Sequence, residues 1–313
     1  MKKTLIAVIT TFLLNLSSEQ GNITKLNGID IWWESHGDVN DPTALLIMGL
    51  NSNSKVWSDQ YIENLVVNNL HVLVFDNRDI GKSTWITEEP GLITFIKYLP
   101  NFLQVYFVEF IFGFIFDEEG KFNMENPAPA EYNLSDMAMD GIALLDHLEI
   151  SEAHIIGASM GGMIAQVMAL EHSDRVKSLT LFFTTPGFDT PGLSGPSESF
   201  KVAMKESFLL NLSGNEIDAL TVSEEALTGS RFPFNKNNFI EKAKIRLNQG
   251  INISNAQTAA VGASPNRASS LKDINQPTLI IHGTKDPLIP DCLLYTSDAA
   301  DEGLGVDLGG RRI

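Results

Sequence analysis

The residues with the clearest chemical potential are residues 157–161, which read GASMG. The apolar run Ala153–Ile156 precedes them, and Gly162–Leu170 follows with apolar residues at helical spacing. A strand that enters a G-x-S-x-G turn and leaves as a helix lifts the serine hydroxyl above the sheet, where the helix N-terminus favours negative charge. A Gly/Ser loop before a helix is the alternative for the pentapeptide alone. Because a strand and a helix flank it, we interpret Ser159 as a catalytic nucleophile.

A serine nucleophile needs a general base and an acid that orients the base. Pro277–Gly283 reads as a buried strand, and Asp286 stands in the loop that leaves it. Chains with this serine turn place the acid after the serine and the histidine last. We therefore predict that Asp286 is the acid; an ordinary turn aspartate before Pro287 is the alternative. The chain has six histidines, none of which follows Asp286: His36, His71, His147, His154, His172 and His282.

The C-terminal segment 292–313 offers an explanation for the missing histidine. It has no apolar periodicity and no helix signal, and it resembles a sequencing adaptor translated in one reading frame. Such a segment is excluded from reasoning about the fold. We expect the native part of this chain to end near Asp291. The chain would then be truncated and would lack the last strand, the last helix and the catalytic histidine of the natural protein. A natural protein without the histidine and with an unusual tail is the alternative.

The composition suits one large globular domain. Hydrophobic residues make up 43% of the chain, and the formal net charge is −17. This charge argues against nucleic acid or anionic lipid as a partner. The single cysteine, Cys292, lies in the adaptor-like tail, and no spacing of histidines or carboxylates indicates a metal site.

The N-terminus has the plan of a secretory signal. Lys2 and Lys3 precede an apolar run from Leu5 to Leu16, and small residues follow. The run is too short to span a bilayer permanently. We expect residues 1–20 to be a signal peptide and the protein to be exported to the periplasm or secreted. An uncleaved anchor or an N-terminal strand is the alternative.

Strands and helices alternate along the body of the chain. The expected elements are strands at Ile29–Ser35, Thr43–Met48, His71–Phe75, Ala153–Ile156, Val176–Phe183 and Pro277–His282, and helices at Val56–Val67 and Leu134–Leu148. Asn133 or Ser135 is the expected N-cap of the second helix. This alternation predicts an α/β fold with a doubly wound, mostly parallel sheet. Active sites in such sheets lie at the carboxyl ends of the strands, where we expect Leu50, Ser159 and Asp286.

One interruption of the alternation indicates a helical cap. Residues 188–270 contain helical stretches but no convincing strand. The cap would be inserted between a first core part, residues 23–187, and a second, truncated core part, residues 271–291.

The other interruption is the apolar insertion Leu92–Phe116 in the first core part. It holds seven of the chain's 18 phenylalanines and two charged residues, Lys97 and Glu109. A helix pair buried under the cap, an apolar wall of a substrate pocket and an interfacial lid that contacts lipid are open alternatives. Pro100 and Gly113 interrupt the segment, which makes a transmembrane helix the least favoured of them.

Over Ile23–Pro290 the chain resembles the α/β-hydrolase superfamily, and its pattern is similar to serine esterases of the aclacinomycin methylesterase type. The segments that carry the resemblance are Leu46–Leu50 (LIMGL), Phe75–Ser83 (FDNRDIGKS), Gly157–Gln166 (GASMGGMIAQ) and His282–Pro287 (HGTKDP). Met48 stands where many members have a histidine. The long apolar insertion also departs from the usual pattern.

The resemblance implies a mechanism and a class of substrate. Ser159 attacks the carbonyl of a small apolar ester, the missing histidine serves as base, and Asp286 orients it. The backbone N–H groups of Leu50 and Met160 form the oxyanion hole. Water releases the acyl group, and no cofactor takes part.

Two other functions remain open at this stage. A peptidase, thioesterase or perhydrolase would use the same fold and the same serine. A non-catalytic binding protein would keep the fold without the histidine.

Overall fold

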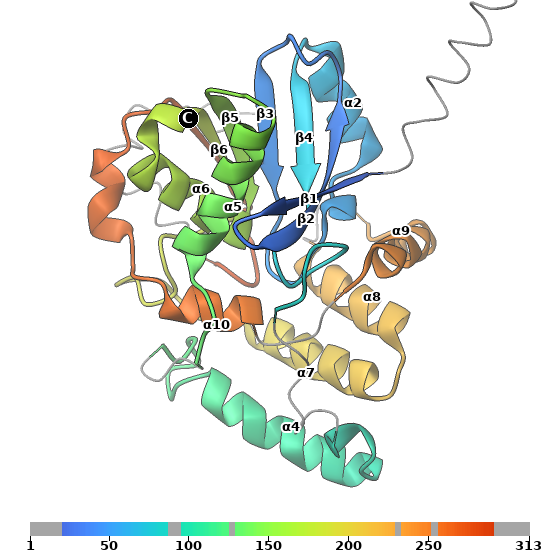
Figure 1. Cartoon of the computed structure of the whole chain (residues 1–313). Coiled ribbons are helices and arrows are strands. Elements are labelled where there is room, and N and C mark those ends of the chain that lie inside the picture. The colour runs from blue at the N-terminus through green and yellow to red at the C-terminus, as the bar shows by residue number, and fades with distance from the viewer. Residues whose placement is uncertain (1–20, 87–94, 125–128, 229–232, 252–255, 291–313) are drawn as a thin grey trace, which may run out of the picture.

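The computed structural model describes residues 21–86, 95–124, 129–228, 233–251 and 256–290 (Figure 1). The expected signal segment, residues 1–20, and the adaptor-like tail, residues 292–313, lie outside the described residues. So do residues 92–94 of the apolar insertion. Within the described ranges, no helix has both the length and the apolar character needed to cross a membrane.

The elements follow the expected alternation. The strands are β1 (Asn22–Leu26), β2 (Ile29–His36), β3 (Thr43–Ile47), β4 (His71–Phe75), β5 (Ala153–Ala158), β6 (Val176–Phe182) and β7 (Thr278–Ile281). The α-helices are α2 (Asp59–Val67), α4 (Asn101–Ile115), α5 (Leu134–His147), α6 (Met160–Glu171), α7 (Glu198–Leu212), α8 (Glu216–Leu227), α9 (Lys236–Gln249) and α10 (Ala256–Ala263). Short 3₁₀ turns occupy Ser54–Val56, Ser173–Arg175 and Ala268–Asp273.

The strands form one sheet in the order β1-β2-β4-β3-β5-β6-β7. The pairs from β4 through β7 are parallel, whereas β1–β2 and β2–β4 are antiparallel. The predicted α/β fold with a doubly wound, mostly parallel sheet is therefore confirmed. Because β3, β5, β6 and β7 run in one direction, their carboxyl ends meet at one edge of the sheet.

Of the edge hairpin formed by β1 and β2, the sequence pattern predicted only β2. Asn27 and Gly28 join the two strands and both have positive φ, 49° and 85°. Asn-Gly with positive φ at both positions is the preferred two-residue hairpin connection. The dipeptide is visible in the sequence and was the signal for β1.

Helices cover both faces of the sheet (Figure 1). Along β3, Leu45 and Ile47 pack into the cluster that includes α5 and α6, and Ala44 and Leu46 pack into the cluster that includes α2. Successive side chains of a strand point to opposite faces, so a strand covered on both sides reads as an unbroken apolar run. All five residues of β3 are buried.

Helix α5 begins where the sequence indicated. The side chain of Asn133 accepts hydrogen bonds from the backbone N–H groups of Ser135 and Asp136, and the Asp136 carboxylate accepts one from Asn133 N–H. This reciprocal pair is a capping box, which satisfies N–H groups that have no partner inside the helix. Of the two expected N-caps, Asn133 is the one in use.

Between β6 and β7 the described chain forms helices α7 to α10, which lie beyond the carboxyl ends of the strands in Figure 1. Helix α4 lies outside α7, at the lower edge of the molecule in that view. All four residues of β7 are only half-buried, and β6 is its neighbour in the described sheet.

Candidate active site

Ser159 occupies a sharp turn between β5 and α6. Its φ and ψ are 54° and −121°, a backbone conformation that residues other than glycine rarely adopt. The backbone N–H of Ser159 donates to Phe182 O at 2.9 Å, and the Thr184 hydroxyl donates to Ser159 O at 2.7 Å. Hydrogen bonds from the neighbouring strand region thus hold the unfavourable conformation in place.

The glycines on either side of the serine are needed because the backbone comes too close for a side chain. A Cβ atom on Gly157 would lie 2.3 Å from Gly161 O, and one on Gly161 would lie 2.1 Å from Ile47 O. These obstacles are backbone atoms, which have little freedom to move away. The G-x-S-x-G pattern is therefore a requirement of local geometry, as the turn predicted from the sequence needs.

The loop after β3 passes next to the serine. A Cβ atom on Gly49 would lie 2.9 Å from Ser159 Cβ and 3.4 Å from Ser159 Oγ. Leu50, the next residue, is partly exposed, whereas Met160 is buried. The structure thus brings the expected oxyanion loop to the expected nucleophile.

The two predicted oxyanion donors have no competing partner within the described residues. The N–H groups of Leu50 and Met160 form no hydrogen bond there. Met160 is the first residue of α6, so its N–H has no acceptor inside the helix. Both groups are available to a negatively charged oxygen.

Asp286 follows β7 and so stands at the same sheet edge as Ser159. Its Oδ1 accepts hydrogen bonds from the N–H groups of Leu288 and Ile289, both at 2.9 Å. Its Oδ2 lies 3.7 Å from Nε2 of His282. One carboxylate oxygen therefore shapes its own loop, as in the turn alternative. This use of Oδ1 leaves Oδ2 as the oxygen that could orient a base.

All six histidines lie in the described ranges, and none forms a hydrogen bond with Ser159 Oγ. The ring of His71 bonds to Ser35 and Thr43, that of His154 bonds to Ser178, and Nε2 of His282 lies 2.8 Å from Ile289 O.

A buried carboxylate that sequence reasoning did not single out connects the loops near Ser159 to α9. Asp76 follows β4, is fully buried, and accepts hydrogen bonds from Ser54 N–H at 2.8 Å, Lys82 N–H at 3.0 Å and Gln249 Nε2 at 2.6 Å. Burial raises the pKa of the Asp76 carboxyl above its usual value of 3.8, against the effect of these hydrogen bonds. The signal was present in the segment Phe75–Ser83, to which no role had been assigned.

The oxyanion loop itself is held from two sides. The Asn77 side chain donates to Met48 O at 3.0 Å, and Asn51 N–H donates to Gln257 Oε1 at 2.8 Å. The same Gln257 donates from Nε2 to Arg78 O at 2.8 Å. Leu50 therefore lies between two residues whose backbone is fixed by buried side chains.

Arg78 in turn fixes the loop after β4 to α5. Its guanidinium makes two hydrogen bonds with the buried Asp140 carboxylate, at 2.7 and 2.8 Å, and lies 4.9 Å from the centre of the Tyr132 ring. Such a bidentate pair is directional and holds both partners in one geometry. In the ranges that the structure describes, no group of three or more histidine, cysteine or acidic side chains could hold a metal ion.

Residues 42–300 match the profile of the family described as "alpha/beta hydrolase fold". Rhodomycin D methylesterase DauP of Streptomyces sp. (strain C5) is 25% identical over 288 residues, which cover 86% of this chain and 83% of that protein. Rhodomycin D methylesterase DnrP of Streptomyces peucetius is 27% identical over 153 residues, which cover 49% of this chain and 38% of that protein. The profile match extends into the first residues of the adaptor-like segment.

Solved structures share the fold. An esterase from Thermogutta terrifontis superposes with a TM-score of 0.61 at 18% identity, over 92% of this chain and 89% of that one. A hydrolase from Pseudomonas aeruginosa PA01 gives a TM-score of 0.60 at 19% identity, over 94% and 92% of the two chains. At this level of identity the likeness concerns the fold alone.

Proposed function

The chain belongs to the alpha/beta hydrolase fold family, and we propose that it is a serine hydrolase that cleaves carboxylic esters through an acyl-enzyme. The observation that carries the proposal is the backbone of Ser159, with its φ of 54° between β5 and α6. Such a conformation is unfavourable and persists where its surroundings enforce it, as around a nucleophile lifted above a sheet.

The proposed reaction has two halves. Ser159 Oγ attacks the ester carbonyl carbon while a base accepts the hydroxyl proton, and the N–H groups of Leu50 and Met160 stabilise the oxyanion. The carbon–oxygen bond to the alcohol then breaks, and the alcohol leaves with the proton from the base. Water, deprotonated by the same base, attacks the acyl carbon. The bond between that carbon and Ser159 Oγ then breaks, Oγ takes the proton back from the base, and the acid is released. Loss of one oxyanion donor typically costs about 2.7–4 kcal/mol of transition-state stabilisation.

The base in this proposal is a histidine that the chain does not carry. All six histidines precede Asp286 in the sequence, and those with side-chain hydrogen bonds are engaged away from Ser159. Asp286 Oδ2 would orient the missing imidazole. The half-buried β7 supports the same proposal, because a further strand and helix would cover it.

The proposed substrate is a small apolar ester. The names of the two methylesterase relatives support a carboxylic ester over an amide or a thioester. A compact leaving alcohol such as methanol fits that likeness. The chemistry requires no cofactor, since the serine and its base carry out both steps.

We further propose that residues 1–20 direct export. Lys2 and Lys3, followed by the apolar run from Leu5 to Leu16, support this. Expression with and without residues 1–20, followed by fractionation of cells and N-terminal sequencing, tests it. Retention of the full chain in the cytoplasm with an intact N-terminus would contradict it.

The decisive experiment for the enzymatic proposal compares this chain with a version carrying the natural C-terminus beyond Asp291. Both are assayed on 4-nitrophenyl acetate and on methyl esters of apolar acids, with Ser159→Ala in the completed version as the control. We expect hydrolysis by the completed version alone. Comparable activity of the two chains would overturn the assignment of the base. A folded, inactive completed version would favour a binding protein instead.

A further inference from the structure

Helix α4 and the turn before it carry aromatic side chains at every fourth position. We call Tyr98, Phe102, Tyr106, Phe110 and Phe114 the aromatic ridge; each is between 56% and 85% exposed. Residues four apart are neighbours on a helix, so the rings of Phe102, Tyr106, Phe110 and Phe114 follow one another along α4. Tyr98 lies in the turn that precedes the helix. Rings this large are uncommon on the surface of a soluble protein unless they have a partner.

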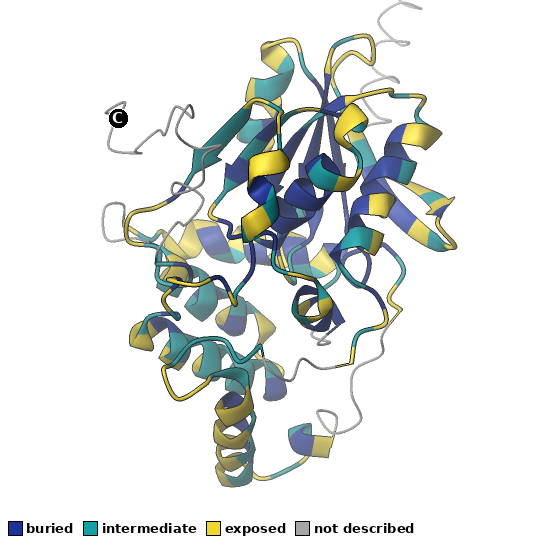
Figure 2. Cartoon of the chain, turned by 90° about the vertical axis from the view of Figure 1, so that its left-hand side faces the viewer, coloured by how far each residue is buried: buried dark blue, intermediate teal, exposed yellow. Residues whose placement is uncertain are grey.

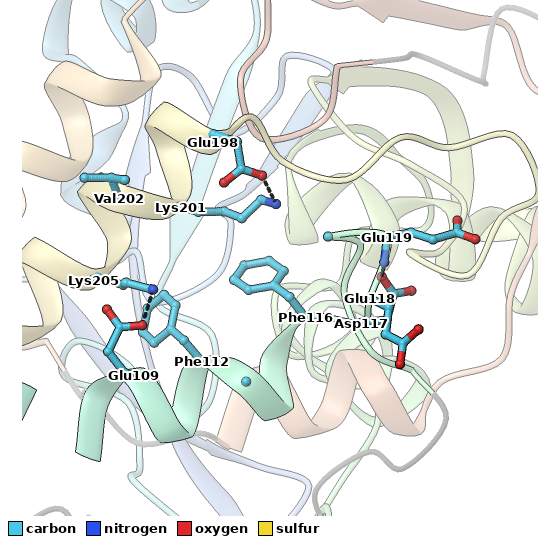
Figure 3. A pocket seen from close by; sticks show the side chains of 12 residues that line it. Glu109, Phe112, Phe116, Asp117, Glu118, Glu119, Glu198, Lys201, Val202 and Lys205 are labelled. Carbon is cyan, nitrogen blue, oxygen red and sulfur yellow. Dashed lines mark hydrogen bonds and ion pairs between the residues drawn. The ribbon is translucent and has the colours of Figure 1, made fainter. Parts of the chain in front are cut away.

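The opposite side of α4 is packed, so the exposure of the ridge does not come from a loosely placed helix. Val108 and Phe112 are buried against Leu212 of α7. Glu109 forms an ion pair with Lys205, whose ammonium lies 5.6 Å from the centre of the Phe112 ring. Figure 3 shows this ion pair and the ring beside a pocket between α4 and α7. The pocket is open and has a volume of about 420 Å³.

The charge around the ridge restricts its partner. The insertion Leu92–Phe116 contains only Lys97 and Glu109 as charged residues, and Lys205 neutralises Glu109. The chain that follows α4 is acidic, with Asp117, Glu118 and Glu119, and the whole chain carries −17. The ridge itself carries no charge that would pair with an anionic or a strongly cationic partner. An uncharged apolar surface is therefore the partner that matches it.

The shape of the ridge favours a lipid surface over a second copy of the chain. Helix α4 stands at the lower extremity of the molecule in Figures 1 and 2 and is mostly coloured as exposed in Figure 2. Because this single 15-residue helix projects from the molecule, a second copy would meet the ridge along one helix alone, whereas a bilayer surface can receive the whole row of rings.

We propose that the aromatic ridge docks on a zwitterionic lipid bilayer, with α4 lying in the plane of the interface. Phenylalanine rings enter the acyl boundary, and the tyrosine hydroxyls stay among the headgroups, where amphipathic rings are favoured. The cap packed on the inner side of α4 provides the polar side that interfacial helices need. This proposal does not depend on ester hydrolysis.

The test measures binding of the full chain to sucrose-loaded phosphatidylcholine vesicles by sedimentation. The ridge variant is Phe102→Ser/Tyr106→Ser/Phe110→Ser. The matched control is Val39→Ser/Val67→Ser/Ile245→Ser, which removes three exposed apolar side chains elsewhere. Circular dichroism and urea denaturation check that both fold like the parent.

We expect the ridge variant to lose at least about tenfold in the partition coefficient and the control to bind like the parent. Vesicles with phosphatidylserine should bind no more tightly than phosphatidylcholine alone. Equal binding by parent and ridge variant, or no binding by the parent, overturns the proposal. So does a parent that sediments as a dimer and becomes monomeric in the ridge variant without vesicle binding, because the occupant would then be a second copy.

Discussion

The side-chain oxygen of Gln257 accepts a hydrogen bond from the backbone N–H of Asn51 at 2.8 Å. Gln257 belongs to α10, and Asn51 follows Leu50, the predicted oxyanion donor beside Ser159. The amide nitrogen of the same Gln257 donates to Arg78 O, also at 2.8 Å. One fully buried side chain therefore holds together α10 and two loops at the carboxyl edge of the sheet.

This relationship predicts a defect in catalysis from a residue that touches no substrate. In the C-terminally completed enzyme, Gln257→Leu should lower kcat by about tenfold to a hundredfold with little change in KM, because the Leu50 N–H shifts away from the oxyanion. Gln257→Glu keeps the acceptor for Asn51 and should retain more of the rate. Stopped-flow or steady-state ester assays measure both variants. Equal losses in kcat for Leu and Glu would show that the Asn51 hydrogen bond is not the cause.

The Asp286 side chain allows its two roles to be separated. Asp286→Asn keeps an oxygen that can accept from Leu288 and Ile289, so the loop and the free energy of unfolding should change little. The rate of the completed enzyme should nevertheless fall by about four orders of magnitude, since an amide cannot stabilise an imidazolium. Asp286→Ala should lose both the rate and the loop hydrogen bonds. A rate for Asp286→Asn within tenfold of the parent contradicts the assignment.

Ser159→Ala should abolish ester hydrolysis by the completed enzyme, with a loss of at least about a thousandfold. The fold should survive, because the turn is held by backbone atoms of Ser159 and not by its hydroxyl. Rate measurements and circular dichroism spectra of the two proteins check this. Residual activity above a few per cent would place the nucleophile elsewhere.

Two glycine substitutions should have opposite effects on stability. Gly161→Ala places a Cβ atom 2.1 Å from Ile47 O, and we expect it to lower the free energy of unfolding by about 2 kcal/mol or more. Gly113 lies in α4 with no atom within 4 Å of its built Cβ, so Gly113→Ala should raise it by about 0.5–1 kcal/mol. Urea denaturation of the chain as it stands measures both. An unchanged or raised free energy of unfolding for Gly161→Ala would contradict the close approach at the serine turn, and a lowered one for Gly113→Ala would contradict the open space at α4.

The raised pKa of Asp76 predicts a specific pH dependence of stability. The folded state binds a proton at this carboxyl more tightly than the unfolded chain, because burial disfavours the carboxylate. The stabilisation linked to this proton is complete below the usual pKa of 3.8 and is lost as the pH rises through the folded pKa. The free energy of unfolding of the parent minus that of Asp76→Asn should therefore fall over this window and then stay constant. Urea denaturation from about pH 3.5 to 7 measures it, and a difference that rises with pH would show that the hydrogen bonds to Asp76 outweigh its burial.

Local patterns in the sequence determined much of the scaffold. The apolar run of β3 and the Asn133 cap of α5 can be recognised from neighbouring residues, and each was found where expected. Of the glycines around Ser159, Gly157 is required by the nearby Gly161, whereas Gly161 is required by Ile47 in the distant strand β3. The hairpin turn at Asn27 and Gly28 is also a local feature, so the sequence contained the signal for β1 although β1 was not predicted.

Only the tertiary structure decided how the loops at the sheet edge are held and which side of α4 is covered. Asp76 and Gln249 are 173 residues apart in the sequence, and Asn51 and Gln257 are 206 apart, so no periodicity could pair them. The apolar insertion was compatible with burial or with lipid, because hydrophobicity alone does not say which neighbours a helix meets. The packing of α7 against Val108 and Phe112 covered one side and left the aromatic ridge facing outward. The polarity of a side chain determines which kind of neighbour stabilises it when it is buried. Whether such a neighbour lies next to it depends on the tertiary structure.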